Sequence, residues 1–203
     1  MATTTPNYGW PVPTSTDLVK DGATAIEDLG DAIDATVFGL ADPGITLIST
    51  ASFSAVSSIS LAASSFTATY RNYKLVVNAT YSTSTNLRIR LRAAGADDTT
   101  SNYGIQNFSA NNTTLSGARG TAMSYFDTQQ ANQNNVTGEI DFYNPQTVEI
   151  SRMKYSYSNS QSSSEFICLG NGNFNATTSF DSATIFPSTG TITGTYSLYG
   201  YAK

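Results

Sequence analysis

Hydrophobic and polar residues alternate strictly along several short segments of the chain. The clearest segments are YKLVVNATY (73–81), NLRIRLRAA (86–94), VTGEIDFY (136–143) and GTITGTYSLYGY (190–201). A period of two places alternate side chains on opposite faces of a strand, so that one face is buried and the other meets water. Turn-forming residues separate these runs. The pattern predicts a mainly β protein, with an antiparallel β-sandwich of jelly-roll type over residues 45–203.

Residues 16–38 follow a different period. Apolar or small residues recur there at alternating spacings of three and four, which is the heptad repeat of a coiled coil. The glycine and proline residues of FGLADPG then favour the end of a helix and a turn, so we expect a linker over 39–44. The expected helix over 16–38 has a seam made of Val19, Gly22, Ile26, Leu29 and Ile33.

This helix needs a partner. Gly22 and Gly30 each cost about 1 kcal/mol relative to alanine, and a helix of this length is marginal in water by itself. Either the β region covers the seam, or copies of the same helix pack around a common axis. The spacing alone leaves both arrangements open.

The first fifteen residues, MATTTPNYGWPVPTS, contain three prolines and the single tryptophan. Proline fixes φ and removes a donor, so we expect an extended arm over residues 1–15. Its two large aromatic side chains cannot be buried by so short a segment. The arm either folds back loosely or docks on another chain, with Trp10 as the anchor, and docking is the favoured interpretation. The candidate docking residues are Tyr8, Trp10, Pro11 and Pro13.

Charge is sparse and unevenly distributed. Charged residues make up 12% of the chain, against about 25% in ordinary globular domains, and the net charge is −5. Six acids and one base lie between Asp17 and Asp34, whereas the remainder has nine of each. No cluster of Lys and Arg predicts a nucleic-acid partner. No apolar run approaches the ~20 residues of a membrane span, so we expect no membrane insertion.

Catalytic and metal chemistry have little support. The chain has no histidine, which excludes Ser-His-Asp, Cys-His and histidine-metal sites. No spacing of carboxylates matches a metal site, and no glycine-rich loop has the context of a phosphate site. The single cysteine, Cys168 in EFICLG, is expected to be a small buried apolar residue. We expect a protein that is not an enzyme and has no metal or cofactor.

Two features could bind a ligand. Arg88, Arg90 and Arg92 share one face of their strand. Their favoured interpretation is a ladder of ion pairs with acids such as Glu139 and Asp141, within the chain or between subunits, and the alternative is a site for an anionic ligand.

The second feature is the segment 102–135, which is rich in Asn, Gln and aromatic residues. Aromatic rings stack on sugar faces and amides bond sugar hydroxyls, so these loops are either a glycan site or plain exposed loops. The candidate residues are Tyr103, Asn107, Phe108, Asn111, Asn112 and Tyr125.

Two parts of the chain resemble known proteins. TPNYGWPVPTSTDLVKDGATAIEDLGDAID (5–34) resembles the N-terminal segment of tailed-bacteriophage virion proteins, the minor tail and tail-fibre proteins. RNYKLVVNATYSTSTNLRIRLRAAGADDTTSNY (71–103) and SFDSATIFPSTGTITGTYSLYGYAK (179–203) are similar to β domains of the same group.

The resemblance implies a homotrimeric component of the virion. The arm and helix would lie near the attachment point on other phage structural proteins, and the β domain would project outward and adsorb to host surface glycan. A capsid head fibre or decoration protein is the alternative. The resemblance also favours a bundle of helices over a helix packed on the sheet.

Overall fold

The computed structural model describes residues 3–14, 18–40, 44–128, 136–161 and 164–202. Contacts between backbone positions divide the chain into two compact units, Met1–Gly44 and Ile45–Lys203. The predicted start of the helix at 16–17 and residues 41–43 of the predicted linker lie outside the described residues.

The N-terminal unit is a small hairpin packed on a helix. Strands β1 (Thr3–Thr4) and β2 (Pro11–Val12) pair antiparallel, and the turn between them includes Gly9 at a φ of 69°. A 3₁₀ turn, η1 (Val19–Asp21), leads into helix α1 (Gly22–Leu40). The arm is therefore extended only locally. It folds back as a hairpin because glycine adopts the left-handed conformation that the turn requires.

The hairpin contacts α1 through its tryptophan. Trp10 Nε1 donates a hydrogen bond of 2.9 Å to Thr36 Oγ1, which in turn donates to the carbonyl of Ala32. The Trp10 ring stacks on Tyr8, with their centroids 5.2 Å apart. Trp10 is thus engaged by its own helix in this structure.

The predicted seam of α1 is only partly covered. Leu29, Ile33 and Gly22 are half-buried. In contrast, Val19 is 97% exposed and Ile26 is 66% exposed. The hairpin therefore covers one flank of the helix and leaves the other in solvent.

The observed helix also differs in extent from the expectation of 16–38. It continues to Leu40, because Gly39 keeps helical geometry and does not adopt the positive φ of a C-terminal cap. Val19 lies in the 3₁₀ turn that precedes the helix.

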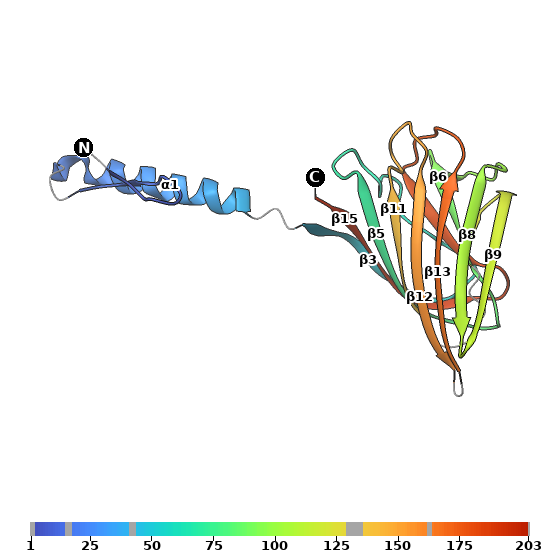
Figure 1. The fold of residues 1–203 in the computed structure, drawn as a ribbon. Coiled ribbons are helices and arrows are strands. Elements are labelled where there is room, and N and C mark those ends of the chain that lie inside the picture. The colour runs from blue at the N-terminus through green and yellow to red at the C-terminus, as the bar shows by residue number, and fades with distance from the viewer. Residues whose placement is uncertain (1–2, 15–17, 41–43, 129–135, 162–163, 203) are drawn as a thin grey trace. The chain divides into compact units, whose positions relative to one another are not determined.

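The second unit consists of antiparallel strands in two sheets (Figure 1). The eight-stranded sheet has the order β3-β15-β5-β11-β12-β13-β8-β9, and the five-stranded sheet has the order β10-β6-β14-β4, with β7 paired to β6. The eight-stranded sheet comprises β3 (Ile45–Val56), β15 (Ile192–Tyr201), β5 (Asn72–Tyr81), β11 (Val136–Tyr143), β12 (Arg152–Gln161), β13 (Ser164–Phe174), β8 (Tyr103–Asn111) and β9 (Thr114–Met123). The five-stranded sheet comprises β10 (Phe126–Asp127), β6 (Leu87–Ala93), β14 (Ser182–Pro187), β4 (Ile59–Ser60) and β7 (Ala96–Asp97).

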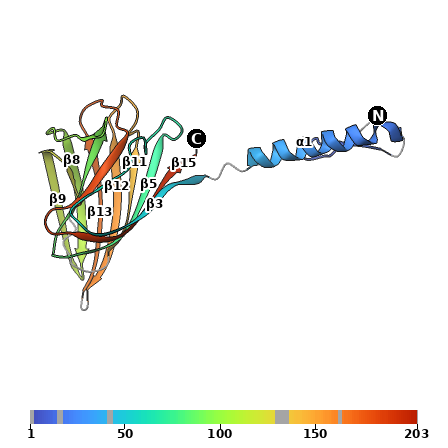
Figure 2. The ribbon, with the colours of Figure 1, turned by 180° about the vertical axis from the view of Figure 1, so that it is seen from behind.

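The two sheets share one core. Figure 2 shows β14, in orange-red, crossing in front of the longer strands of the eight-stranded sheet. Leu75 and Ile140 of the eight-stranded sheet belong to the same buried cluster as Ile89 and Ile185 of the five-stranded sheet. All four side chains are fully buried, so the apolar faces of both sheets meet.

The alternation in the sequence matches the burial of these strands. In β5, the side chains at 73, 75, 77, 79 and 81 are buried, and in β6 those at 87, 89 and 91 are buried. A mainly β protein with antiparallel sheets and one N-terminal helix, as the sequence predicts, is the architecture of the chain. No helix in the described part of the chain is both long and apolar enough to cross a bilayer.

Candidate functional site

The three arginines of β6 face outward from the five-stranded sheet. Arg88 Nε donates to Asp127 Oδ2 over 3.1 Å, and the Asp127 side chain is almost fully buried. Asn86 Nδ2 donates to the other oxygen of the same carboxylate at 2.9 Å. The nearly buried Asp127 carboxylate therefore accepts hydrogen bonds from both Arg88 and Asn86, and it links β10 to β6.

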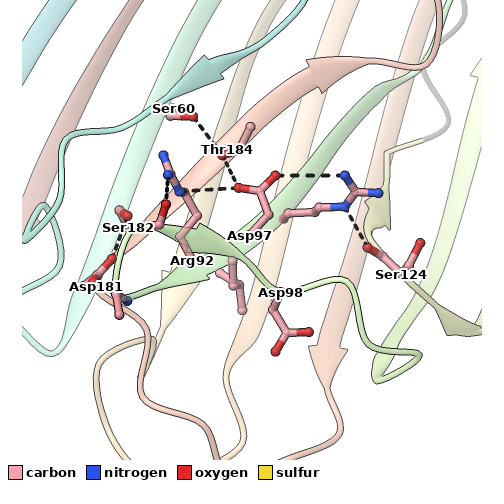
Figure 3. A network of polar contacts seen from close by, with 12 residues as sticks. Ser60, Arg92, Asp97, Asp98, Ser124, Asp181, Ser182 and Thr184 are labelled. Atoms are coloured by element: carbon pink, nitrogen blue, oxygen red, sulfur yellow. Dashed lines mark hydrogen bonds and ion pairs between the residues drawn. The ribbon is translucent and has the colours of Figure 1, made fainter.

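Asp97 pairs with the other two arginines (Figure 3). Its oxygens lie 3.4 Å from Arg92 Nε and 3.9 Å from Arg90 Nη1. Thr184 Oγ1 donates to the same carboxylate over 2.6 Å and shares a hydrogen bond with Ser60. Arg90 Nε also donates to the carbonyl of Ser124.

Aromatic rings complete this face. The guanidinium of Arg88 lies 4.2 Å from the centroid of the Tyr125 ring, and that of Arg90 lies 4.8 Å from the centroid of Phe186. The three arginines are thus paired with the carboxylates of Asp97 and Asp127, and two of the guanidinium groups also lie over aromatic rings. The arginine row is a ladder of ion pairs within the chain, which was the favoured interpretation, but its acids are Asp97 and Asp127.

The predicted acids pair elsewhere because they lie on the other sheet. Lys74 Nζ lies 2.6 Å from Glu139 Oε2 and 3.2 Å from Asp141 Oδ1. Burial lowers the pKa of Lys74, but the hydrogen bonds that its ammonium group donates to both carboxylates, together with their charge, raise the pKa above its ordinary value. Tyr201 adds a hydrogen bond to Asp141.

Two of the predicted glycan residues have buried side chains that face the core. Tyr103 is fully buried on β8, where its hydroxyl donates to the carbonyl of Asp98 and accepts from the amide of Leu91. Asn107 is also buried, and its Nδ2 donates to the hydroxyl of Tyr155. Both side chains point into the core because they occupy the inward positions of β8.

The other predicted glycan residues lie in separate places. Asn111 and Asn112 are exposed at the tip of the β8–β9 hairpin, where Asn112 adopts a φ of 52°. Tyr125 is half-buried under the arginines of the other sheet. Phe108 is 48% exposed, and its side chain faces outward from β8. Among the aromatic residues of the predicted glycan site, Phe108 is the one whose ring is largely exposed to solvent. The end of the predicted glycan segment, 129–135, lies outside the described residues.

Strand register brings a group of side chains around Phe108. Cross-strand rows run over β12, β13, β8 and β9, and the side chains of every second row face outward. We call the two rows at Phe108 the Phe108 surface. One row is Lys154, Asn171, Gln106 and Arg119, and the next is Ser156, Leu169, Phe108 and Gly117.

The Phe108 surface combines an aromatic ring with amides. Gly117 lies directly opposite Phe108 and has no side chain to cover the ring. Gln106 and Asn171 are exposed in the neighbouring row, and Gln106 Nε2 donates to the carbonyl of Ala118. A shallow hollow of about 410 Å³ runs beside Phe108 and Leu169. An open ring beside amides can stack on a sugar face and bond its hydroxyls.

Sequence reasoning found one residue of this surface and missed the others. Asn171 and Arg119 lie on strands far from Phe108 in the sequence or across a hairpin, so only the register places them together. The segment GNGNF (170–174) carried a signal, because its glycines alternate with asparagines that point outward.

A larger hollow, of about 720 Å³, lies elsewhere on the β unit. It is lined in part by Tyr70, Arg71, Glu149 and Tyr201. Its charges neutralise each other, because Arg71 Nη2 lies 3.2 Å from Glu149 Oε2. The Phe108 surface is the better candidate because it offers an uncovered ring.

Cys168 is buried, and burial raises the pKa of its thiol to about 11. A thiol of this kind is a poor nucleophile near neutral pH. Within the described residues, no group of three or more Cys, Asp and Glu side chains is placed to hold a metal ion.

These features define the chain as a mainly antiparallel β protein with a candidate ligand surface on its larger sheet. No family model and no curated protein sequence matches the chain. Among solved structures, it is similar to the galectin LEC-6 of Caenorhabditis elegans, with 13% identity and a TM-score of 0.30. The match covers 78% of this chain and 96% of the galectin. A likeness at this level carries no argument about ligand or function.

Proposed function

We propose that this chain is a structural component of a tailed-bacteriophage virion, a homotrimeric tail fibre or minor tail protein without catalytic activity. Its β unit, a sandwich of jelly-roll type, adsorbs to glycan on the host surface. A capsid head fibre or decoration protein is the alternative. The observation that carries the proposal is the Phe108 surface, an uncovered aromatic ring beside two amides on a rigid sheet.

The sheet suits adsorption because it holds the binding groups in place. Strands β12, β13 and β8 are each paired with a strand on both sides, and the edge strand β9 is paired with β8. The backbone of such a scaffold needs no ordering on binding, which lowers the entropic cost of contacts with a polymer. Three copies on one fibre would raise the avidity further.

The helix supports the trimer. Ala23, Ile26, Gly30 and Val37 are exposed on the flank that the hairpin leaves uncovered, at spacings of three, four and seven, and Ile33 at the intervening heptad position is half-buried. Ile26 and Val37 are mostly exposed there. Exposed branched side chains at heptad spacing are stabilised when copies of the helix bury them together, and Ala23 and Gly30 allow the helices to approach closely.

Competition with the phage tests the adsorption. Purified full-length chain should bind host cells and reduce phage adsorption. Phe108→Ala should lose this effect, because it removes the ring. Val148→Ala is the matched control, since it removes another exposed apolar side chain of the β unit.

A second variant guards against misfolding of the first. Gly117→Val would place a side chain opposite Phe108, and the nearest atom to a new Cβ is Asn107 O at 3.4 Å, an ordinary contact. We expect this variant to fold and to block adsorption. If both variants compete as well as the wild type, the Phe108 surface is not the binding site. Gold label against the chain on the capsid, rather than the tail, would favour the alternative.

A further inference from the structure

In the Phe108 surface, the row that contains Gln106 carries a charged side chain at each end. Lys154 on β12 and Arg119 on β9 are both exposed, with Asn171 and Gln106 between them. Since neighbouring strands lie about 4.8 Å apart, the two cations are roughly 14 Å apart at the backbone. The row therefore offers a cation at each end of a strip of amides.

No carboxylate of the surface neutralises them. The two rows of the Phe108 surface contain no Asp or Glu. Among the ion pairs of the described residues, neither Arg119 nor Lys154 takes part in one. The nearest acid in register is Asp141, opposite Lys154 on β11, and it is held by Lys74 and Tyr201.

This distinguishes Arg119 from most arginines of the β unit. Arg88, Arg90 and Arg92 share buried or half-buried carboxylates, and Arg71 has Glu149. Arg119 instead lies on β9, the edge strand of its sheet, and faces solvent beside Gln106. Its guanidinium is free to form a paired hydrogen bond with an anion.

Arg119 and Phe108 are placed for one ligand. Phe108 lies opposite Gly117, and Arg119 is two residues further along β9. Diagonal neighbours of this kind have their Cα atoms about 7–8 Å apart, within reach of long side chains. A single sugar ring on Phe108 can thus present an acidic substituent to Arg119.

We infer that the Phe108 surface selects anionic saccharides, with a sugar ring stacked on Phe108 and a carboxylate or phosphate group bound by Arg119. Lys154 receives a second anionic group further along the same polymer. This inference rests on the proposed function, because it names the class of glycan that the adsorption site takes.

An array of matched saccharide pairs tests it. Uronic-acid oligosaccharides are compared with their methyl esters, and phosphorylated oligosaccharides with their dephosphorylated forms, using the full-length chain. We expect the acidic member of a pair to bind at least about tenfold more tightly, and its binding to weaken as salt rises. The uronic and phosphate arms distinguish the two sources of charge.

Substitutions test whether Arg119 is the cation that binds the acidic group. Arg119→Gln should weaken the preference for the acidic member, with Lys154 retaining part of it, and should keep binding to the neutral one. Arg71→Gln is the control, because it removes the same charge from another part of the β unit. Equal binding of both members by the wild type, or an unchanged preference in Arg119→Gln, would overturn the inference. Binding to no member of the array would instead count against the proposed glycan function.

Discussion

Asp127 is the most deeply placed acid in the ion pairs of the β unit. Its side chain is only 7% exposed, and it accepts hydrogen bonds from Arg88 and Asn86. The hydrogen bonds from these donors help to offset the cost of removing this carboxylate from water. The contribution of Asp127 to the stability of the β unit therefore depends on the geometry of these hydrogen bonds as well as on its charge.

Asp127→Asn should destabilise the β unit by about 2 kcal/mol, because it leaves the half-buried Arg88 without its anion. Arg88 is partly exposed, so water limits the loss. Urea unfolding followed by circular dichroism measures the change. Glu149→Gln breaks the exposed pair with Arg71 and should change stability by less than about 1 kcal/mol. Equal unfolding midpoints for the two variants would show that the Asp127–Arg88 pair stabilises the β unit no more than the exposed Glu149–Arg71 pair does.

Single residues of the site were the hardest to predict. In the segment of β8, apolar side chains occur on both faces, since Ile105 is buried and Phe108 is exposed. Period two then fails to reveal which asparagines and tyrosines point inward. Tyr103 and Asn107 were expected in a ligand site for this reason, and the structure buries both.

At the scale of elements, α1 has two apolar flanks. One flank is closed by the hairpin that carries Trp10, and the other exposes Ile26 and Val37. The sequence predicted one seam and two ways to cover it. It could not reveal the hairpin, because two-residue strands such as Thr3–Thr4 give no periodicity to detect.

Ile26→Lys tests the uncovered flank. If the helices form the proposed trimer, the full chain should have about three times its mass of 21.6 kDa, and the charged side chain should return it to the monomer. Light scattering at several concentrations measures the mass. Ala35→Lys adds the same charge at another exposed position of α1, away from the uncovered flank, and should stay trimeric. A wild-type chain that is monomeric at all concentrations would remove the trimer.

The strands themselves were more predictable than their partners. Alternation identified β5, β6, β11 and β15, and the burial of their side chains agrees with it. Pairing depends on contacts between distant segments, which no local pattern encodes. The arginines of β6 therefore met Asp127 of β10 rather than Glu139 of β11.

At the scale of the whole molecule, the core is rich in tyrosine. Desolvation by burial raises the pKa values of Tyr81, Tyr103, Tyr155 and Tyr157 above the ordinary value, despite the hydrogen bonds that lower some of them. These groups stay protonated in the folded state at a pH where the unfolded chain has lost the protons. The unfolded state then binds fewer protons, so stability falls as pH rises.

Alkaline unfolding should begin as pH passes the unfolded tyrosine pKa of about 10. Each tyrosine that remains protonated lowers the stability by about 1.4 kcal/mol for every further pH unit. We expect the tyrosinate absorbance of these four buried tyrosines to appear in the same transition as the loss of circular dichroism. Ionisation of all tyrosines near pH 10 with the fold intact would contradict this account.

The cross-strand register of β12, β13, β8 and β9 has a consequence for how such a protein diversifies. Each strand contributes one side chain per row, and moving a strand by one residue would turn its whole set to the other face. If this surface binds a ligand as proposed, substitutions at fixed positions can change its specificity, whereas a shift of strand register would remove the surface. If the chain adsorbs to host glycan as proposed, variants adapted to new hosts should differ on these rows by point substitutions and keep the register of the four strands.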